Sequence, residues 1–200
     1  MGVLAMTAVQ QLPDGSTIEP RVTGRGATVW LTGLPSAGKS TIAAGVAALL
    51  REAGRAVEVL DGDVVRASLT RDLGFSRADR DENVRRIGFV ARLLAKHGVL
   101  VLVPVIAPYA ASRDALRDAH AASGTDFVEV YVATPVGVCS ARDVKGLYAK
   151  QRAGALRNLT GVDDPYEPPA APELVLPADR QTERESIAAL FDFLIRRLSS

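Results

Sequence analysis

The chain has 200 residues, of which 48% are hydrophobic, and a single cysteine, Cys139. This composition predicts one compact α/β domain for a reducing, cytoplasmic environment, without an internal disulfide or a zinc site. The formal net charge is +1 and Lys and Arg form no long run, which argues against nucleic-acid binding. No apolar run approaches the roughly 20 residues of a membrane span, and the first residues lack a targeting signal.

Residues 1–25 are rich in Pro, Gly and polar side chains without clear periodicity, which predicts a tail or an irregular lead-in. From Thr28, short β-branched runs alternate with longer helical patterns. The runs are TVWLTG, AVEVLD, VLVLVPVI and FVEVYV, and the last helical pattern begins near Thr182. This order predicts a single domain over residues 26–200, with a parallel sheet flanked by helices on both faces, as in P-loop NTPases.

Residues 33–40, GLPSAGKS, fit the pattern G-x-x-x-x-G-K-[ST] between a predicted strand and a predicted helix. Glycine at both ends of the loop lets successive N–H groups turn toward one phosphate, near the positive end of the helix. Lys39 would reach the β- and γ-phosphates, and the Ser40 hydroxyl suits Mg²⁺ that arrives with ATP. The predicted ATP-binding residues are Gly33, Leu34, Pro35, Ser36, Ala37, Gly38, Lys39, Ser40 and Thr41.

Two carboxylates, Asp61 and Asp63, follow the second predicted strand at its carboxyl end, where open α/β sheets bind ligands. One carboxylate can accept the proton of an attacking hydroxyl group, the role we expect for Asp63, while the other orients water on Mg²⁺. The alternative is a solvated D-G-D turn without chemistry. A guanine-reading N-K-x-D is absent from the sequence, so a kinase is favoured over a GTPase switch.

Residues 76–79, SRAD, form a capping box that predicts a helix over about 77–96. Its apolar stripe extends back by three and four residues to Arg80 and Asn83, so both side chains are expected to face the protein. The alternative, which also applies to Arg66, is pairing with acids on a solvated face. Phe75 either packs on the first turn or stacks on a base. The stripe consists of Val84, Ile87, Ala91 and Leu94.

A basic segment at residues 143–172 ends in DDPYEPPAAP, which interrupts regular structure. We therefore expect a mobile basic flap, called the lid below. Its basic side chains include Lys145, Lys150, Arg152 and Arg157.

Seven segments of the chain, in order, resemble adenylylsulfate kinases, and together they cover about residues 28–172. They are GLPSAGKST, LDGDVVR, DLGFSRADRDENVRRIG, VIAPY, FVEVYV, RDVKGLYAK and LTGVDDPYEPP. The resemblance implies transfer of the γ-phosphate of ATP to the 3′-hydroxyl of adenosine 5′-phosphosulfate, in a protein that is typically a homodimer. The alternatives are another P-loop small-molecule kinase and a nucleotide-binding regulatory module without turnover. Any ATP sulfurylase would be a separate partner, because we expect the kinase domain to use the full 200 residues.

The resemblance also implies roles for matching residues of the predicted acceptor site. Arg66, Arg80 and Asn83 would hold the phosphosulfate and ribose, and Phe75 would stack on the acceptor adenine. Asp61 and Asp63 would serve the hydroxyl group and Mg²⁺.

In the same family, the lid covers both nucleotides, so Lys145 would touch sulfate or phosphate and Arg142 would lie against the ATP adenine. Closure of such a lid would exclude competing water. The remaining acceptor contacts implied by the matching motifs are Ile106, Ala107, Gly146, Leu147 and Leu159.

The chain departs from the family pattern at four positions. Ala107 and Ala110 stand for the Ser and Arg of I-S-P-Y-R, Val144 for a proline, and Leu159 for an aromatic residue. Ala107 excludes a phosphoserine intermediate at that position and predicts direct in-line transfer between the two nucleotides. With Leu159, the adenine clamp would have one aromatic wall, and a stacking contact is worth about 1 kcal/mol.

Overall fold

The centre of the fold is β3 (Ala27–Thr32), six buried residues in a computed structural model that describes residues 10–11, 17–18 and 24–198. Strands covered on both faces are mostly apolar, and β3 has this pattern, with Thr28 and Thr32 as its buried polar residues. It pairs in parallel with a neighbour on each side, within a five-stranded sheet of order β4-β5-β3-β6-β7. The other strands are β4 (Val57–Val59), β5 (Leu100–Val103), β6 (Asp126–Val132) and β7 (Leu174–Leu176).

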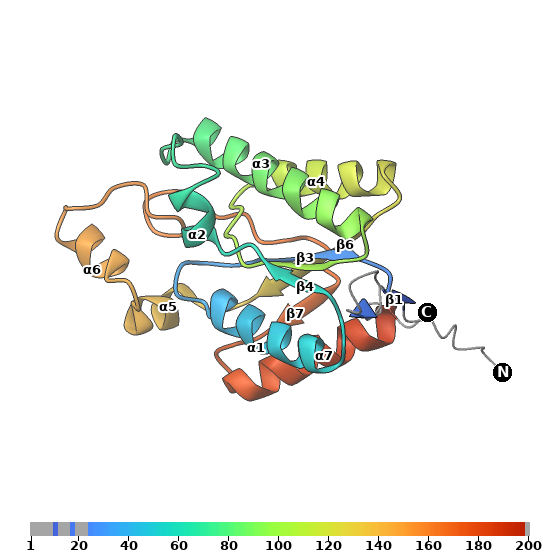
Figure 1. Ribbon diagram of the computed structural model, residues 1–200. Coiled ribbons are helices and arrows are strands. Elements are labelled where there is room, and N and C mark those ends of the chain that lie inside the picture. Colours follow the sequence, from blue (N-terminus) through green and yellow to red (C-terminus); the bar gives the residue numbers. More distant parts are fainter. Residues whose placement is uncertain (1–9, 12–16, 19–23, 199–200) are drawn as a thin grey trace.

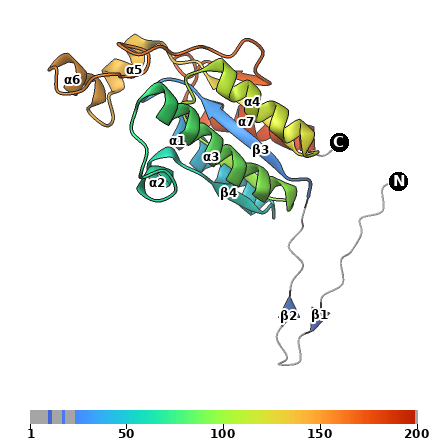
Figure 2. The ribbon, with the colours of Figure 1, turned by 90° about the horizontal axis from the view of Figure 1, so that it is seen from above.

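Helices cover both faces of this sheet (Figures 1 and 2). α1 (Lys39–Glu52) and α7 (Glu183–Leu198) pack together on one face, and α3 (Arg77–Lys96) and α4 (Ala110–Ala122) on the other. A cluster of buried apolar side chains lies on each face. The predicted parallel sheet with helices on both faces is therefore confirmed. None of the described helices is both long and apolar enough for a membrane crossing.

The start of α3 follows the predicted capping box. Ser76 Oγ accepts a hydrogen bond from the Asp79 N–H at 3.2 Å, and the Asp79 carboxylate accepts one from the Ser76 N–H at 3.3 Å. The helix then approaches α4 closely at Gly88, where a Cβ would lie 2.1 Å from Leu116 Cδ2. This packing sets the amino-terminal turns of α3 at the carboxyl edge of the sheet.

Three short elements were not predicted from the sequence: α2 (Gly62–Ala67), α6 (Leu147–Arg152) and β7. A fourth, α5 (Val136–Arg142), coincides with a helical pattern that precedes Asp143 in the sequence. α6 lies inside the predicted flap, which is thus partly helical, and the Asp143 carboxylate fixes its start by accepting the N–H groups of Tyr148 and Ala149 at 3.0 and 2.8 Å. α5 and α6 lie at the same end of the molecule as α2 (Figure 1).

Part of the predicted amino-terminal lead-in is described. β1 (Gln10–Gln11) and β2 (Thr17–Ile18) form an antiparallel pair within it. Residues 1–9, 12–16 and 19–23 of that prediction lie outside the described residues.

Candidate active site

The loop between β3 and α1 has a backbone that only particular residues permit. Gly33 has φ 149°, and a Cβ there would lie 2.6 Å from the Val132 carbonyl oxygen. Gly38 has φ 106° and precedes α1, which begins without a side-chain cap. The first N–H groups of α1 therefore have no capping side chain and can bind an anion such as a phosphate group.

Lys39 is buried within this loop, with 7% of its surface exposed. Its Nζ donates to the carbonyl oxygens of Gly33 and Leu34 at 2.9 and 2.7 Å. Burial lowers the Lys39 pKa from 10.5 to about 8, because removal from water disfavours the charged amine. A bound phosphate would supply negative charge that stabilises the protonated form of this amine.

Asp61 and Asp63 lie where β4 leads into α2. Ser40 Oγ donates to Asp61 Oδ2 at 2.6 Å, and Asp61 Oδ1 accepts the Asp63 N–H at 2.9 Å. Hydroxyl and carboxylate oxygens fit Mg²⁺, which usually binds through one or two protein oxygens together with substrate phosphates. The side chain of Asp63 is 70% exposed and forms an ion pair with Lys145 of the lid.

Arg80 and Asn83 both face the protein, as the stripe on α3 predicted, with exposures of 8% and 5%. Arg80 pairs with Asp164 of the lid at 3.3 Å and donates to Thr160 Oγ1 and the Asn158 carbonyl oxygen at 3.0 and 2.7 Å. For Arg80, the alternative of pairing with acids on a solvated helix face is therefore wrong. Asn83 Oδ1 is buried without a hydrogen-bond partner among the described residues.

Phe75 is 59% exposed, so it does not pack as a core residue on the first turn of α3. The Arg66 guanidinium lies over its ring, 4.4 Å from the centroid. The pKa of Arg66 is lowered by burial and, next, by the positive charge of Arg80. Two neighbouring guanidinium groups beside an exposed aromatic ring suit an anionic ligand that carries a base.

These groups line one pocket of about 660 Å³, called the active-site pocket below. It lies between the phosphate loop, α2, α3 and the lid. Of the residues predicted from the sequence, it is lined by Pro35, Ser36, Ala37, Gly38, Lys39, Ser40, Thr41, Asp61, Asp63, Arg66, Phe75, Arg80, Asn83, Ile106, Ala107, Arg142, Lys145 and Leu147.

Four predicted site residues do not line this pocket: Gly33, Leu34, Gly146 and Leu159. Leu159 is 5% exposed and belongs to the core cluster on the α1 face of the sheet. Its side chain therefore packs in the protein interior and forms no second wall opposite Phe75.

The pocket also contains residues that sequence reasoning missed, at the end where β7 leads into α7. Arg142 joins this end to the phosphate loop by donating to the carbonyl oxygens of Ala178 and Ala37 at 2.7 and 3.3 Å. Gln181 Oε1 and Ser186 Oγ line the pocket and are buried without hydrogen-bond partners among the described residues. The loop before α7 carries no motif that would have indicated them.

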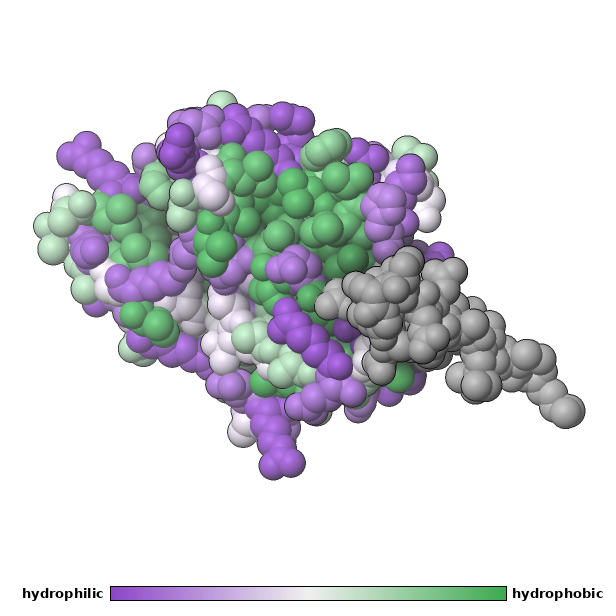
Figure 3. Space-filling model, in the orientation of Figure 1, coloured by the Kyte–Doolittle hydropathy of each residue, from purple (hydrophilic) through white to green (hydrophobic). Residues whose placement is uncertain are grey.

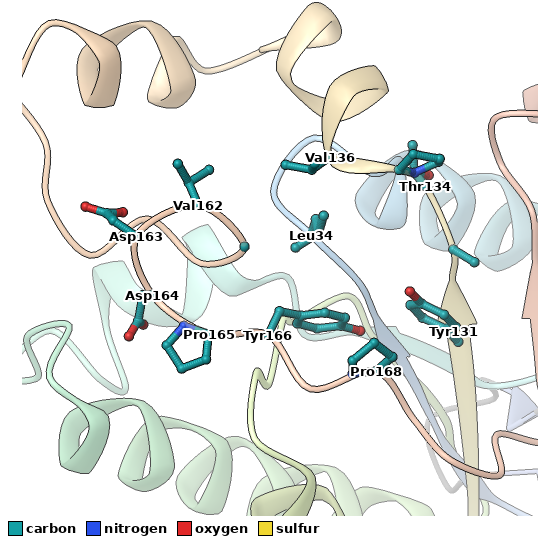
Figure 4. A pocket seen from close by; sticks show the side chains of 13 residues that line it. Leu34, Tyr131, Thr134, Val136, Val162, Asp163, Asp164, Pro165, Tyr166 and Pro168 are labelled. Carbon is teal, nitrogen blue, oxygen red and sulfur yellow. The ribbon is translucent and has the colours of Figure 1, made fainter.

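A second pocket of about 670 Å³ is lined by Leu34 of the phosphate loop, with Val136 and Val162 beside it (Figure 4). The rings of Tyr131 and Tyr166 stack along it, with centroids 6.2 Å apart. Its carboxylates are engaged: Asp163 accepts backbone N–H groups and Asp164 pairs with Arg80. None of its described lining residues is basic, so this pocket does not suit a triphosphate.

A glycine-bounded loop with a buried lysine, two carboxylates after β4 and a cationic region around Arg66 and Arg80 in one pocket define a P-loop kinase for small molecules. The model of the adenylylsulphate kinase family matches residues 25–177, and the chain belongs to this family. This confirms the family resemblance of its motifs.

Individual relatives agree with this assignment. The adenylyl-sulfate kinase of Synechococcus sp. (strain JA-3-3Ab) is 54% identical over 176 residues, which cover 88% of this chain and 96% of that protein. The Mycobacterium tuberculosis APS kinase CysC, solved in complex with AMPPNP and APS, has a TM-score of 0.82 at 49% identity, covering 86% of this chain and 99% of that one. A hexameric APS kinase from Thiobacillus denitrificans has a TM-score of 0.66 at 38% identity, covering 88% of this chain and 30% of that one.

Proposed function

We propose that this chain transfers the γ-phosphate of ATP to the 3′-hydroxyl of adenosine 5′-phosphosulfate, which gives 3′-phosphoadenosine 5′-phosphosulfate. The observation that carries the proposal is that a single pocket contains both the phosphate loop and the cationic, aromatic region around Arg80 and Phe75. Asp63 lines the same pocket, at the carboxyl end of the sheet. The related APS kinase solved with AMPPNP and APS supports this assignment.

On the donor side, the N–H groups of the phosphate loop bind the β- and γ-phosphates of ATP, and Lys39 turns from the loop carbonyls toward them. Ser40 and Asp61, whose side-chain oxygens lie within hydrogen-bond distance of each other, would hold Mg²⁺. When bound, the metal would neutralise charge on the transferred phosphate group. Arg142, at the end of α5, lies against the adenine of ATP.

On the acceptor side, Phe75 stacks on the adenine, while Arg66 and Arg80 hold the phosphosulfate and Asn83 the ribose. Asp63 accepts the proton of the 3′-hydroxyl group. The exposed ion pair of Asp63 with Lys145 opens readily, because such pairs contribute only about 0–1 kcal/mol. Lys145 then contacts the phosphosulfate as the lid closes. Because residue 107 is an alanine, transfer is direct.

The acceptor class is tested by the release of ADP from Mg²⁺-ATP with adenosine 5′-phosphosulfate, AMP, shikimate or gluconate as the acceptor. The proposal predicts turnover with adenosine 5′-phosphosulfate alone. Preference for one of the other acceptors would contradict the family-based assignment. Tight binding of adenosine 5′-phosphosulfate without turnover would instead favour a regulatory module.

We also propose that the chain forms a homodimer through the outer face of α3. Phe89 and Leu93 on this helix are 55% and 49% exposed, and Figure 3 shows apolar surface gathered on the side that carries α3. A contiguous exposed apolar surface is typical of an interface. Light scattering of Phe89→Asp and Leu93→Asp should report monomers, and unchanged mass would contradict this interface.

The setting of the reaction is proposed from its chemistry. The kinase domain spans residues 26–200, with a lid at about 143–172, and acts in the cytoplasm, where a buried thiol such as Cys139 stays reduced. Its acceptor must come from an enzyme that transfers the adenylyl group of ATP to sulfate with release of pyrophosphate, so a separate ATP sulfurylase is the expected partner.

A further inference from the structure

Residues 105–108 form a turn that lines the active-site pocket together with the phosphate loop, and it is called the acceptor turn below. All four of its successive backbone carbonyl oxygens accept hydrogen bonds from groups of the protein. From residue 105 to 108, the donors are Trp30 Nε1 at 3.1 Å, Thr32 Oγ1 at 2.5 Å, Arg113 Nη1 at 2.7 Å and the Glu167 N–H at 2.8 Å. These carbonyl dipoles are therefore occupied by the protein and do not face the ligand.

Withdrawal of the carbonyl groups matters because the proposed acceptor is an anion. A carbonyl oxygen turned into the pocket would set partial negative charge beside the phosphosulfate and would weaken its binding. The arrangement is strained at one residue, Ala107, which is 1% exposed and has φ 45°. A non-glycine residue in the left-handed region is disfavoured, so its peptide group tends to turn unless it is held.

Arg113 of α4 holds this residue. Its side chain is 2% exposed and donates three hydrogen bonds of 2.7 Å, to Ala107 O, Glu167 O and Glu129 Oε1. Glu129 balances the buried charge, and the rigid guanidinium fork binds the acceptor turn and the end of the lid at the same time.

Further contacts fasten the same end of the lid. Glu167 Oε2 accepts the Ala110 N–H at 2.7 Å, and the Tyr166 hydroxyl lies 3.0 Å from Thr32 Oγ1. Figure 4 shows Asp164, Pro165 and Tyr166 following one another along this irregular segment of the lid. Since Asp164 pairs with Arg80 in the active-site pocket, the acceptor turn and the lid are held together behind the acceptor.

We propose that Arg113 is a positioning residue that sets the affinity for the anionic acceptor by keeping the Ala107 carbonyl group turned away from the pocket. Arg113 does not line the pocket, and it acts only through the acceptor turn and Glu167. The inference rests on the proposed function, because it concerns the acceptor of that reaction. The donor site is built from other elements, so ATP binding should not depend on Arg113.

The test is Arg113→Lys, which retains a positive charge beside Glu129 but replaces the planar fork, whose three nitrogens each donate to a different acceptor, by one compact ammonium group that cannot reproduce this spread geometry. We expect the KM for adenosine 5′-phosphosulfate to rise about tenfold, equivalent to about 1.4 kcal/mol. The KM for ATP should change by less than about twofold, and urea unfolding should establish that the variant is folded.

Arg117→Lys is the matched control. Arg117 lies one turn further along α4 and pairs with Glu129 and Glu173, without a hydrogen bond to the acceptor turn or Glu167 among the described contacts. The substitution Arg117→Lys removes a similar guanidinium fork beside the same Glu129 carboxylate. The KM values for adenosine 5′-phosphosulfate and for ATP should therefore both stay near those of the wild type. If Arg113→Lys fails to fold, Thr32→Val removes the donor to Ile106 O and should raise the acceptor KM in the same direction.

An unchanged acceptor KM in the folded Arg113→Lys variant would overturn the inference. An equal rise in both KM values, or an equal effect of Arg117→Lys, would do the same, because either result indicates general loosening. Wild-type protein that does not turn over adenosine 5′-phosphosulfate would instead refute the proposed function, before any variant is compared.

Discussion

The buried amine of Lys39 should make the stability of the nucleotide-free protein depend on pH. Substitution of the lysine by a residue without an amine should abolish this dependence. The chain folds this side chain back onto the Gly33 and Leu34 carbonyl oxygens, and burial lowers its pKa from 10.5 to about 8. The perturbation is Lys39→Met, which keeps the length and the apolar stem of the side chain but removes the titrating group.

The magnitude follows from the two pKa values. Below about pH 8, both states of the protein carry the proton, and the folded state bears the cost of a buried charge. Between about pH 8 and 10.5, the unfolded chain binds more protons than the folded one, so the free energy of unfolding rises with pH. A pKa difference between 10.5 and about 8 corresponds to about 3 kcal/mol at about 1.4 kcal/mol per unit.

The assay is urea unfolding of wild type and Lys39→Met, without nucleotide, across this pH range. As the pH rises through this range, the free energy of unfolding of the wild type should increase by about 3 kcal/mol relative to that of Lys39→Met. The contributions of the other titrating groups cancel, because both proteins share them. Saturating Mg²⁺-ATP should reduce the shift for the wild type, because phosphate stabilises the charged amine. Parallel curves for the two proteins would refute the reasoning.

Three further substitutions separate binding from chemistry. Phe75 is 59% exposed, so Phe75→Ala should change the free energy of unfolding by less than about 0.5 kcal/mol, yet raise the acceptor KM about tenfold through lost stacking. An unchanged acceptor KM would contradict that role. Lys145→Ala breaks an exposed ion pair and should cost less than about 1 kcal/mol of stability, while kcat/KM for the acceptor falls; a large loss of stability in urea would contradict this account. Asp63→Asn should lower kcat at least about 100-fold with an unchanged Kd for ATP, and near-normal turnover of the folded variant would exclude Asp63 as the base.

Local sequence signals predicted the parts of the structure that depend on neighbouring residues. The phosphate loop and the capping box at Ser76 each lie within a few consecutive residues, and the structure has both where the sequence indicated them. The inward direction of Arg80 and Asn83 followed from helical periodicity, which the buried stripe of α3 fixes.

The parts that sequence reasoning missed depend on contacts between distant segments. The anionic partner of Arg80 is Asp164 of the lid. The two residues are far apart in the sequence, and no local pattern connects them. Leu159 occupies the position of a clamp residue but packs into the core, because the lid returns toward the sheet there. α6 and β7 are too short, at six and three residues, to show a periodic pattern.

The central claim is direct transfer of a phosphate group from ATP to the 3′-hydroxyl of adenosine 5′-phosphosulfate. A single-turnover reaction with ATP labelled at the γ-phosphate, quenched at successive times, tests it most directly. The account predicts that all transferred label is in 3′-phosphoadenosine 5′-phosphosulfate and that the protein stays unlabelled throughout, because residue 107 is an alanine. Label on the protein that forms and then decays into product, or product phosphorylated elsewhere, would contradict it.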